Sequence, residues 1–130
     1  MTTATPRVRV VVVNYNGGEL TLACLRAIAA TEWPVGALDV VLVDNASQDG
    51  VTEVVARELP AVQTIVSDAN LGFAGGANLG LQDLPSDTSY VAVVNNDVTV
   101  PPRWLPPLVA ALESDPACGA ACPKILLASK

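Results

Sequence analysis

The residues most able to do chemistry stand in four polar clusters, each directly after a run of apolar residues. The clusters are "NYN" (Asn14–Asn16), "DNASQDG" (Asp44–Gly50), "SDANLG" (Ser67–Gly72) and "NND" (Asn95–Asp97). Amides and carboxylates can hydrogen-bond the edge of a nucleobase, and a carboxylate can hold a hard cation that also binds phosphate. An ordinary turn explains any single cluster equally well. Four such clusters together favour a ligand site.

Four residues in these clusters carry the most specific chemistry. Tyr15 offers an aromatic face on which a base can stack, although a tyrosine at a strand end also serves in packing. Asp44 and Asn45 can hydrogen-bond a base, or they can cap the helix that follows. Asp97 suits a divalent cation, but a single aspartate at a strand end also forms turns. From the residues alone these alternatives stay open.

A glycine-rich stretch, "NLGFAGGANLG" (Asn70–Gly80), follows the third apolar run. Its four glycines let a ligand approach the backbone closely, which makes Asn70 and Gly72 candidate ligand contacts. The stretch is neither the dinucleotide fingerprint, which would follow the first strand, nor the P-loop. Asn78 shares an apolar stripe with Ala74 and Leu81, so we expect it to be buried with a hydrogen-bond partner.

The composition bounds the function classes. The chain has 130 residues, a net charge of -6 and no cluster among its seven lysines and arginines, which argues against nucleic-acid binding. It has no histidine, so a general base must be a carboxylate. The spacing of Cys24, Cys118 and Cys122 completes no zinc site, and we expect small buried thiols in a reducing compartment.

Neither a signal peptide nor a membrane span is predicted. The first 14 residues contain a short apolar run without a small-residue cleavage site, and no stretch approaches the roughly 20 apolar residues of a span. We therefore expect a cytoplasmic protein, with any membrane association made through a C-terminal part beyond these residues.

The elements that must position the polar clusters follow from periodicity. Strands are predicted at Val8–Val13, Val40–Val43, Val62–Val66, Val91–Val94 and, more weakly, Cys118–Cys122. Continuous apolar runs are typical of strands buried on both faces of a parallel sheet. Helical patterns lie between them, so we predict one α/β domain over residues 1–130: a Rossmann-like parallel sheet with flanking helices.

Helix boundaries are predicted from capping residues. Asn16 with Glu19 is expected to cap the first helix, and Asp49 the second. Pro106 and Pro107 fit the last helix only if that helix begins with them.

Four motifs resemble those of family 2 glycosyltransferases, and within that family the rhamnosyltransferase-like branch. They are "VVVNYNGGELTLACLRAI", "VVLVDNASQDG", "NLGFAGGANLG" and "VVNNDVTVPPRWL", in the family's order and at about its spacing. The resemblance implies the GT-A fold, whose Rossmann-like half binds a nucleotide-diphosphate sugar and a divalent metal, Mg²⁺ or Mn²⁺. It also implies a role in cell-wall or polysaccharide biosynthesis.

The resemblance also implies site residues. Tyr15 would stack near the base, Asp44 and Asn45 would contact it, and the Asn95–Asp97 segment would hold ribose, metal and diphosphate. Asp97 would be the metal ligand, because Asn95 stands where the family's Asp-x-Asp motif begins. The full set of candidate donor-binding residues is Asn14, Tyr15, Asn16, Asp44, Asn45, Asn70, Gly72, Asn95, Asn96 and Asp97.

The implied reaction is metal-assisted inverting transfer of a sugar to a hydroxyl of a saccharide or lipid-linked acceptor. The donor would be dTDP-rhamnose or a UDP-sugar. A full GT-A domain is roughly twice this length, so the chain is expected to be the donor-binding part, incomplete at its C-terminus. The catalytic base is expected beyond Lys130, and no catalytic residue is assigned.

Two alternatives remain at this point. One is a non-catalytic nucleotide-sugar-binding module or a truncated product. The other is a receiver-type signalling domain, with Asp44, Asp97 and Lys124 as its phospho-acceptor site. The receiver domain is disfavoured because "NYN" lacks the acidic pair that such domains need after the first strand.

Overall fold

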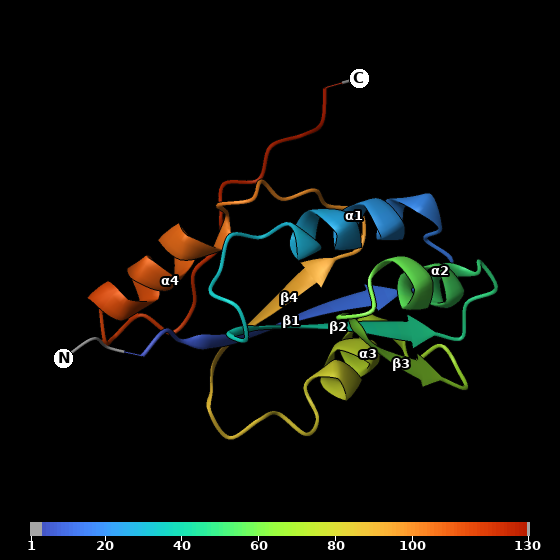
Figure 1. Ribbon diagram of the computed structural model, residues 1–130, viewed down its shortest axis with the longest axis horizontal. Coiled ribbons are helices and arrows are strands. Elements are labelled where there is room, and N and C mark those ends of the chain that lie inside the picture. Colours follow the sequence, from blue (N-terminus) through green and yellow to red (C-terminus); the bar gives the residue numbers. More distant parts are fainter. Residues whose placement is uncertain (1–3, 130) are drawn as a thin grey trace.

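The computed structural model describes residues 4–129, in which four strands alternate with four helices (Figure 1). In chain order they are β1 (Arg7–Asn14), α1 (Glu19–Ala29), β2 (Leu38–Asn45), α2 (Val51–Glu58), β3 (Gln63–Ser67), α3 (Gly72–Gly80), β4 (Thr88–Asn95) and α4 (Leu105–Ser114). The first four predicted strands are confirmed. The two prolines lie in the first turn of α4, as expected.

The strands form one parallel sheet in the order β3-β2-β1-β4. Their carboxyl ends therefore meet at a single edge, toward which the four arrows point in Figure 1. The order begins as in the classical Rossmann arrangement, with β1 between β2 and β4. A receiver domain has the flavodoxin-like order, in which β1 is flanked by β2 and β3, so this topology excludes the receiver alternative.

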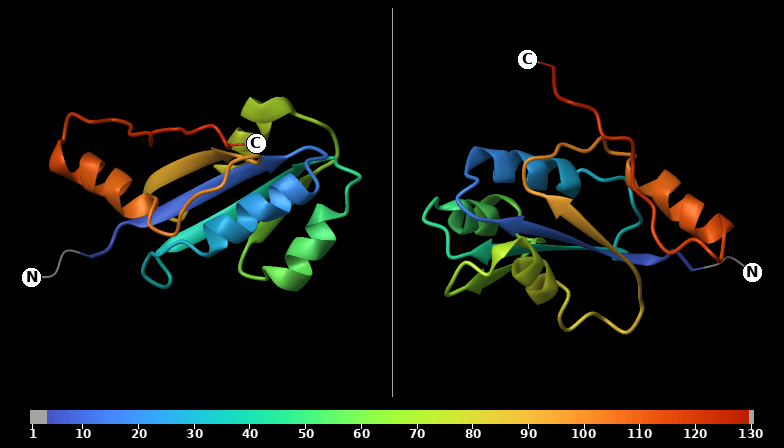
Figure 2. Two further views of the ribbon diagram at one scale, coloured as in Figure 1. Left: turned by 90° about the horizontal axis from the view of Figure 1, so that it is seen from above. Right: turned by 180° about the vertical axis from the view of Figure 1, so that it is seen from behind.

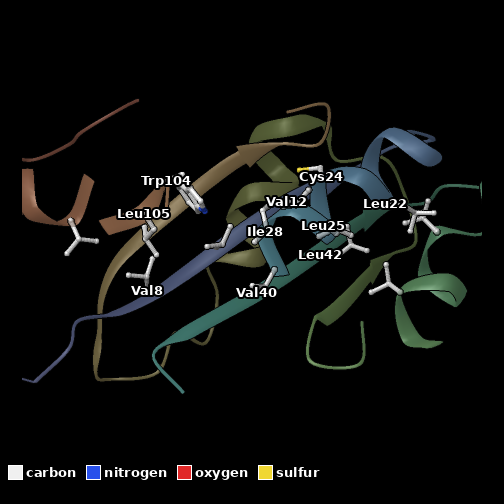
Figure 3. Close-up of a cluster of buried hydrophobic side chains, with 14 residues drawn as sticks. Val8, Val12, Leu22, Cys24, Leu25, Ile28, Val40, Leu42, Trp104 and Leu105 are labelled. Atoms are coloured by element: carbon white, nitrogen blue, oxygen red, sulfur yellow. The ribbon is translucent and has the colours of Figure 1, made fainter. Parts of the chain in front are cut away.

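One face of the sheet carries the larger core. Figure 2 shows α1 and α2 on this face and α3 on the other. Val8, Val10 and Val12 of β1 belong to one buried cluster with side chains of α1, α2 and α4, in which Figure 3 labels Val8 and Val12. Leu25 and Ile28 of α1 are fully buried there. This side depends on large aliphatic side chains, each of which stabilises the fold by about 1.5–3 kcal/mol when fully buried.

The other face carries a thinner layer, built on α3. Gly76 and Gly80 let this helix approach β1 closely: a Cβ at Gly80 would stand 2.5 Å from a methyl group of Val11. The predicted stripe is therefore wrong, because Ala74 and Asn78 are exposed while Gly76, Ala77 and Gly80 face the sheet. A periodicity count cannot recognise a stripe whose members are glycines.

The coverage by α3 does not extend to β4. Val91 and Val93 pair with Arg9 and Val11, so they point to the α3 face, where they are 47% and 42% exposed. β4 is an edge strand within the described part of the chain.

Two further expectations are wrong. Residues 118–122 form no strand, since their glycine and alanine side chains offer little apolar area to bury against the sheet. Of the cysteines only Cys24 is buried, whereas Cys118 is half-buried and Cys122 exposed.

Among residues 4–129 there is no helix with the length and apolar character needed to cross a membrane.

Candidate functional site

The loops after the four strands surround a shallow depression of about 270 Å³ at the carboxyl-end edge of the sheet. Five of the ten candidate donor-binding residues line it, drawn from all four loops: Tyr15, Asn45, Asn70, Gly72 and Asn96. Val13 and Phe73 complete the lining.

Asn14, at the end of β1, is fully buried and holds three segments together. Its Nδ2, which carries two hydrogens, lies within hydrogen-bond distance of three acceptors: Asp44 Oδ1 at 2.8 Å, Asp49 Oδ2 at 3.1 Å and Ser47 Oγ at 3.2 Å. Its Oδ1 accepts from the Gly17 N–H at 3.0 Å and from the Thr21 hydroxyl. We call these residues the Asn14 network. Asn14 thus organises the loops around the depression, and its contact with a ligand stays a prediction.

Asp49 ties the start of α1 to the start of α2. Oδ2 accepts from the Gly18 N–H at 3.0 Å and Oδ1 from the Val51 N–H at 3.2 Å. Burial raises the pKa of Asp49, but these hydrogen bonds and that from Asn14 outweigh it and hold the pKa below its ordinary value. The prediction that Asp49 is the N-cap is one residue off, since Gly50, at φ 71°, occupies that position.

Asn16 ties the first loop to the second and does not cap α1. Its φ is 51°, its N–H donates to Ser47 Oγ at 2.9 Å, and its Oδ1 accepts from the Gln48 N–H at 2.8 Å. The predicted capping pair with Glu19 is wrong, because Gly18 is the N-cap and makes no side-chain cap. Asn16 Oδ1 accepts its hydrogen bond from the second loop, and the side chain makes no cap for α1.

The pair predicted to contact a base, Asp44 and Asn45, is buried. Asp44 Oδ2 accepts from the Ser47 N–H at 3.0 Å, and Oδ1 is held by Asn14. Asn45 Nδ2 donates to the Gly72 carbonyl at 2.9 Å, and its Oδ1 accepts from the Leu71 N–H at 3.4 Å. Asn45 therefore fixes the start of α3 at the wall of the depression.

Two half-exposed aromatic side chains line the depression from different loops. Tyr15 and Phe73 are each 54% exposed. Aromatic faces left open in a depression suit stacking with a planar ring. Tyr15 was predicted from the sequence as a ligand contact, but Phe73 was not. Phe73 lies inside the glycine-rich stretch Asn70–Gly80, and its aromatic character was the available signal.

The segment after β4 is held more loosely. Asn95 and Asp97 have exposed side chains, while the half-buried Asn96 donates from Nδ2 to Thr21 Oγ1 at 2.9 Å. The Asn95 carbonyl accepts from the Cys24 thiol at 3.5 Å. Burial raises the pKa of that thiol to about 11, so Cys24 stays protonated at neutral pH.

The donor set of this segment fits a hard cation shared with a phosphate ligand. Residues 4–129 contain no group of three or more Cys, Asp or Glu side chains that could hold a metal ion. Asp97 supplies one accessible carboxylate, and Mg²⁺ binds in proteins through one or two carboxylates together with waters and substrate phosphates. The segment therefore suits a cation that arrives with a diphosphate.

A second depression, of about 330 Å³, lies toward the amino ends of the strands and is lined by Arg9, Gln63, Ile65, Leu79, Gln82 and Asp83. The positive charge of Arg9 is paired there with the carboxylate of Asp39. Its guanidinium bonds Asp39 Oδ2 at 2.6 and 2.8 Å and donates to the carbonyls of Gly80 and Gln82. Arg9 thus anchors the end of α3, and we assign this depression no ligand.

Sequence similarity links this chain to known proteins. Residues 9–126 match the family described as Glycosyl transferase family 2. Glycosyltransferase AglE of Haloferax volcanii is 29% identical over 108 residues, which cover 81% of this chain and 35% of that protein. The N-acetylglucosaminyl-diphospho-decaprenol L-rhamnosyltransferase of Mycobacterium tuberculosis is 32% identical over 126 residues, covering 89% and 40%. The chain thus spans 35–40% of the length of these relatives.

Solved structures show the same fold. S. aureus TarS 1-349 in complex with UDP superimposes with a TM-score of 0.72 at 19% identity, over 91% of this chain and 38% of that chain. The mannosyltransferase PcManGT from Pyrobaculum calidifontis, in complex with GDP-Man and Mn²⁺, gives a TM-score of 0.66 at 29% identity, over 76% and 30%.

Proposed function

This chain belongs to glycosyl transferase family 2 and has the GT-A type of fold, and we propose that it is the donor-binding part of a glycosyltransferase. The observation that carries the proposal is the convergence of five candidate residues from four loops on one depression, with the exposed Asp97 next in the chain to Asn96, which lines it. Parallel α/β sheets bind ligands at this edge.

In this proposal the base of a nucleotide-diphosphate sugar enters the depression between Tyr15 and Phe73. Asn45 and the backbone at Gly72 form its wall, and the hydrogen bonds of Asn45 to Gly72 and Leu71 hold that wall in place. The diphosphate then extends to the Asn95–Asp97 segment. The uncharged rim supports a donor held through polar and stacking contacts, because none of the lining residues is basic.

We assign Asp97 as the ligand of a divalent cation, with Asn95 and Asn96 at the ribose and diphosphate. The cation would supply stabilisation of the charge that develops on the leaving nucleoside diphosphate. The residues of this chain would bind and orient the donor so that an acceptor hydroxyl attacks the anomeric carbon from the opposite face, with inversion. We assign no catalytic base to residues 4–129.

The names of the relatives support classes of donor and acceptor. The solved neighbours carry UDP, or GDP-Man with Mn²⁺, and the M. tuberculosis relative is named as an L-rhamnosyltransferase for a diphospho-decaprenol carrier. We therefore propose a UDP-sugar or dTDP-rhamnose as donor and a saccharide or lipid-linked saccharide as acceptor.

The test is a calorimetric titration of UDP, dTDP and GDP into the purified chain, with and without Mn²⁺. We expect binding of at least one nucleotide, and we expect the metal to strengthen that binding because it would be shared between Asp97 and the diphosphate. Asp97→Ala should abolish that metal dependence. Asp68→Ala is the matched control, because Asp68 is an exposed aspartate on the loop after β3, at the same edge of the sheet.

The outcomes separate the parts of the proposal. A folded chain that binds none of the three nucleotides contradicts its role as a donor-binding part. Nucleotide affinity that does not change with Mn²⁺ contradicts only the cation site. An equal loss of metal-dependent affinity in Asp97→Ala and Asp68→Ala contradicts it as well.

A further inference from the structure

A line of hydrogen bonds runs from the loop after β4 into the Asn14 network. Asn96 Nδ2 donates to Thr21 Oγ1 at 2.9 Å, and the Thr21 hydroxyl donates to Asn14 Oδ1 at 2.7 Å. Thr21 lies in the first turn of α1 and is fully buried. Its hydroxyl is therefore the link between the segment assigned to the diphosphate and the network that supports the base-binding loops.

The direction of each bond in this line is fixed by its neighbours. Asn14 Oδ1 must be an acceptor, because it also receives the Gly17 N–H, while its Nδ2 faces the carboxylate of Asp44. Thr21 has one hydroxyl hydrogen and uses it on Asn14, so it can only accept from Asn96. The amide of Asn96 is thereby held in a single orientation.

Gly17 provides the space in which these three side chains meet. A Cβ at Gly17 would lie 2.9 Å from Asn14 Oδ1 and still closer to Thr21 Oγ1 and Asn96 Nδ2. Gly17 does not have a positive φ, unlike its neighbour Gly18. The requirement for glycine here is therefore the room taken by the polar atoms and not the backbone conformation.

We propose that Thr21, seated against Gly17, is the positioning residue for Asn96 and through it for the Asn95–Asp97 segment. Beyond the pairing of Asn95 with Val13 in the β1–β4 ladder, the other hydrogen bonds of this segment are long: the Asn95 carbonyl accepts from the Cys24 thiol at 3.5 Å and from the Val98 N–H at 3.4 Å. By holding Asn96 before a ligand arrives, Thr21 lowers the ordering cost of binding at Asp97. The ligand-binding part of this inference rests on the proposed function; the positioning part does not.

Hydrogen–deuterium exchange tests the positioning without any ligand. Thr21→Val keeps the shape and removes the hydroxyl, and we expect amide exchange in residues 95–98 to rise about fivefold, as the loss of one hydrogen bond implies. Thr21→Ser should restore slow exchange. Amides of β2 and β3 serve as the internal reference. Unchanged exchange in residues 95–98 of a folded Thr21→Val variant would overturn the proposal.

Asn96→Ala provides a second route, because it removes the donor and leaves the Thr21–Asn14 bond in place. The same local rise in exchange is expected, and adding Thr21→Val should raise exchange in residues 95–98 no further. An equal additional rise in the double variant would mean that Thr21 acts through Asn14 and not through Asn96. That result, or normal exchange in Asn96→Ala, contradicts the proposal.

Nucleotide titration in the presence of Mn²⁺ adds the functional readout. Thr21→Val should weaken binding about fivefold, while Thr21→Val with Asn96→Ala should bind like Asn96→Ala alone. Wild-type affinity in Thr21→Val would overturn the inference. A wild-type chain that binds no nucleotide would contradict the proposed function, and the exchange measurement would still decide whether Thr21 positions the segment.

Discussion

The loop after β1 and the loop after β4 lie at the same edge of the sheet, yet they are held in different ways. In the first, the Asn14 side chain and the N–H groups of Asn16, Gly17 and Gly18 all have side-chain partners. In the second, Asn95 and Asp97 are exposed, and the side chain of Asn96 makes one hydrogen bond to the protein.

The difference follows from what each loop must leave accessible. A buried polar group costs free energy unless it is hydrogen-bonded, so the loops that wall the depression must satisfy one another. A carboxylate that takes up a cation with a diphosphate needs open coordination positions, and it keeps them only in solvent. In the proposed function, the base-binding side is therefore pre-organised, and the metal-binding side is completed by its ligands.

Removing the centre of the buried side should have the largest effect. Asn14→Ala leaves Asp44 Oδ1, the Gly17 N–H and the hydrogen of the Thr21 hydroxyl without their partner, and we expect a loss of about 3 kcal/mol in the free energy of unfolding. Asn95→Ala, on the exposed side, should change it by less than about 0.5 kcal/mol. Urea denaturation measures both variants, and equal losses would contradict the distinction between the loops.

Gly17 lies between Asn14 of the loop after β1 and Asn96 of the loop after β4, and a methyl group there should disturb both loops. Gly17→Ala is expected to cost about 2 kcal/mol, because its Cβ would displace Thr21 and Asn96. Thermal unfolding measures the loss. Gly119→Ala is the control, since a Cβ at Gly119 meets nothing within 4 Å. A Gly17→Ala variant as stable as this control would show that the loops adjust freely.

Phe73 tests whether the depression takes up a base. Phe73→Ala should weaken binding of a nucleoside diphosphate by about 1 kcal/mol, or roughly fivefold, through the loss of an aromatic face. Val66→Ala provides the control, because Val66 is an exposed apolar residue that does not line the depression. Calorimetry with UDP, dTDP and GDP measures both variants, and equal affinities would remove Phe73 from the site.

Acid should lower the free energy of unfolding through protonation of Asp49, which links the loop after β1 to the start of α2. Because the pKa of Asp49 is lower in the folded chain than the roughly 3.9 of an unfolded aspartate, the unfolded state binds more protons between the two values. This contribution to stability is present above the unfolded pKa and is lost as pH falls through the folded pKa.

Urea denaturation across this acidic range measures the effect. We expect the free energy of unfolding to fall by less than it does in Asn14→Ala. The Asp49→Asn variant should show a shallower dependence of stability on pH than the wild type. Asp68→Asn, at an exposed position, should leave the dependence unchanged. If both variants behave like the wild type, the hydrogen bonds of Asp49 do not contribute to stability.

The sequence by itself determined the order of strands and helices and the edge at which the polar residues gather. The continuous valine runs of β1 and β2 are buried on both faces as predicted, whereas the similar run of β4 leaves Val91 and Val93 exposed on the α3 face. Parallel strands with helical crossovers must bring the loops that follow the four strands to one edge. These conclusions depend on local periodicity and on the rules of chain connection. The four motifs that resemble the family are contiguous stretches of the chain, so they too can be recognised from the sequence alone.

The tertiary structure decided which of those polar residues serve the loops and which face solvent. Asn14 reaches Asp44 and Asp49, 30 and 35 residues away, and Thr21 reaches Asn96 across 75 residues. No local pattern encodes such pairs, because each depends on how α1 and the loops sit on the assembled sheet. The face of α3 that packs on the sheet could not be predicted from periodicity for a related reason. Glycine has no side chain to count, and only the contact with β1 shows that a side chain at Gly76 or Gly80 would not fit.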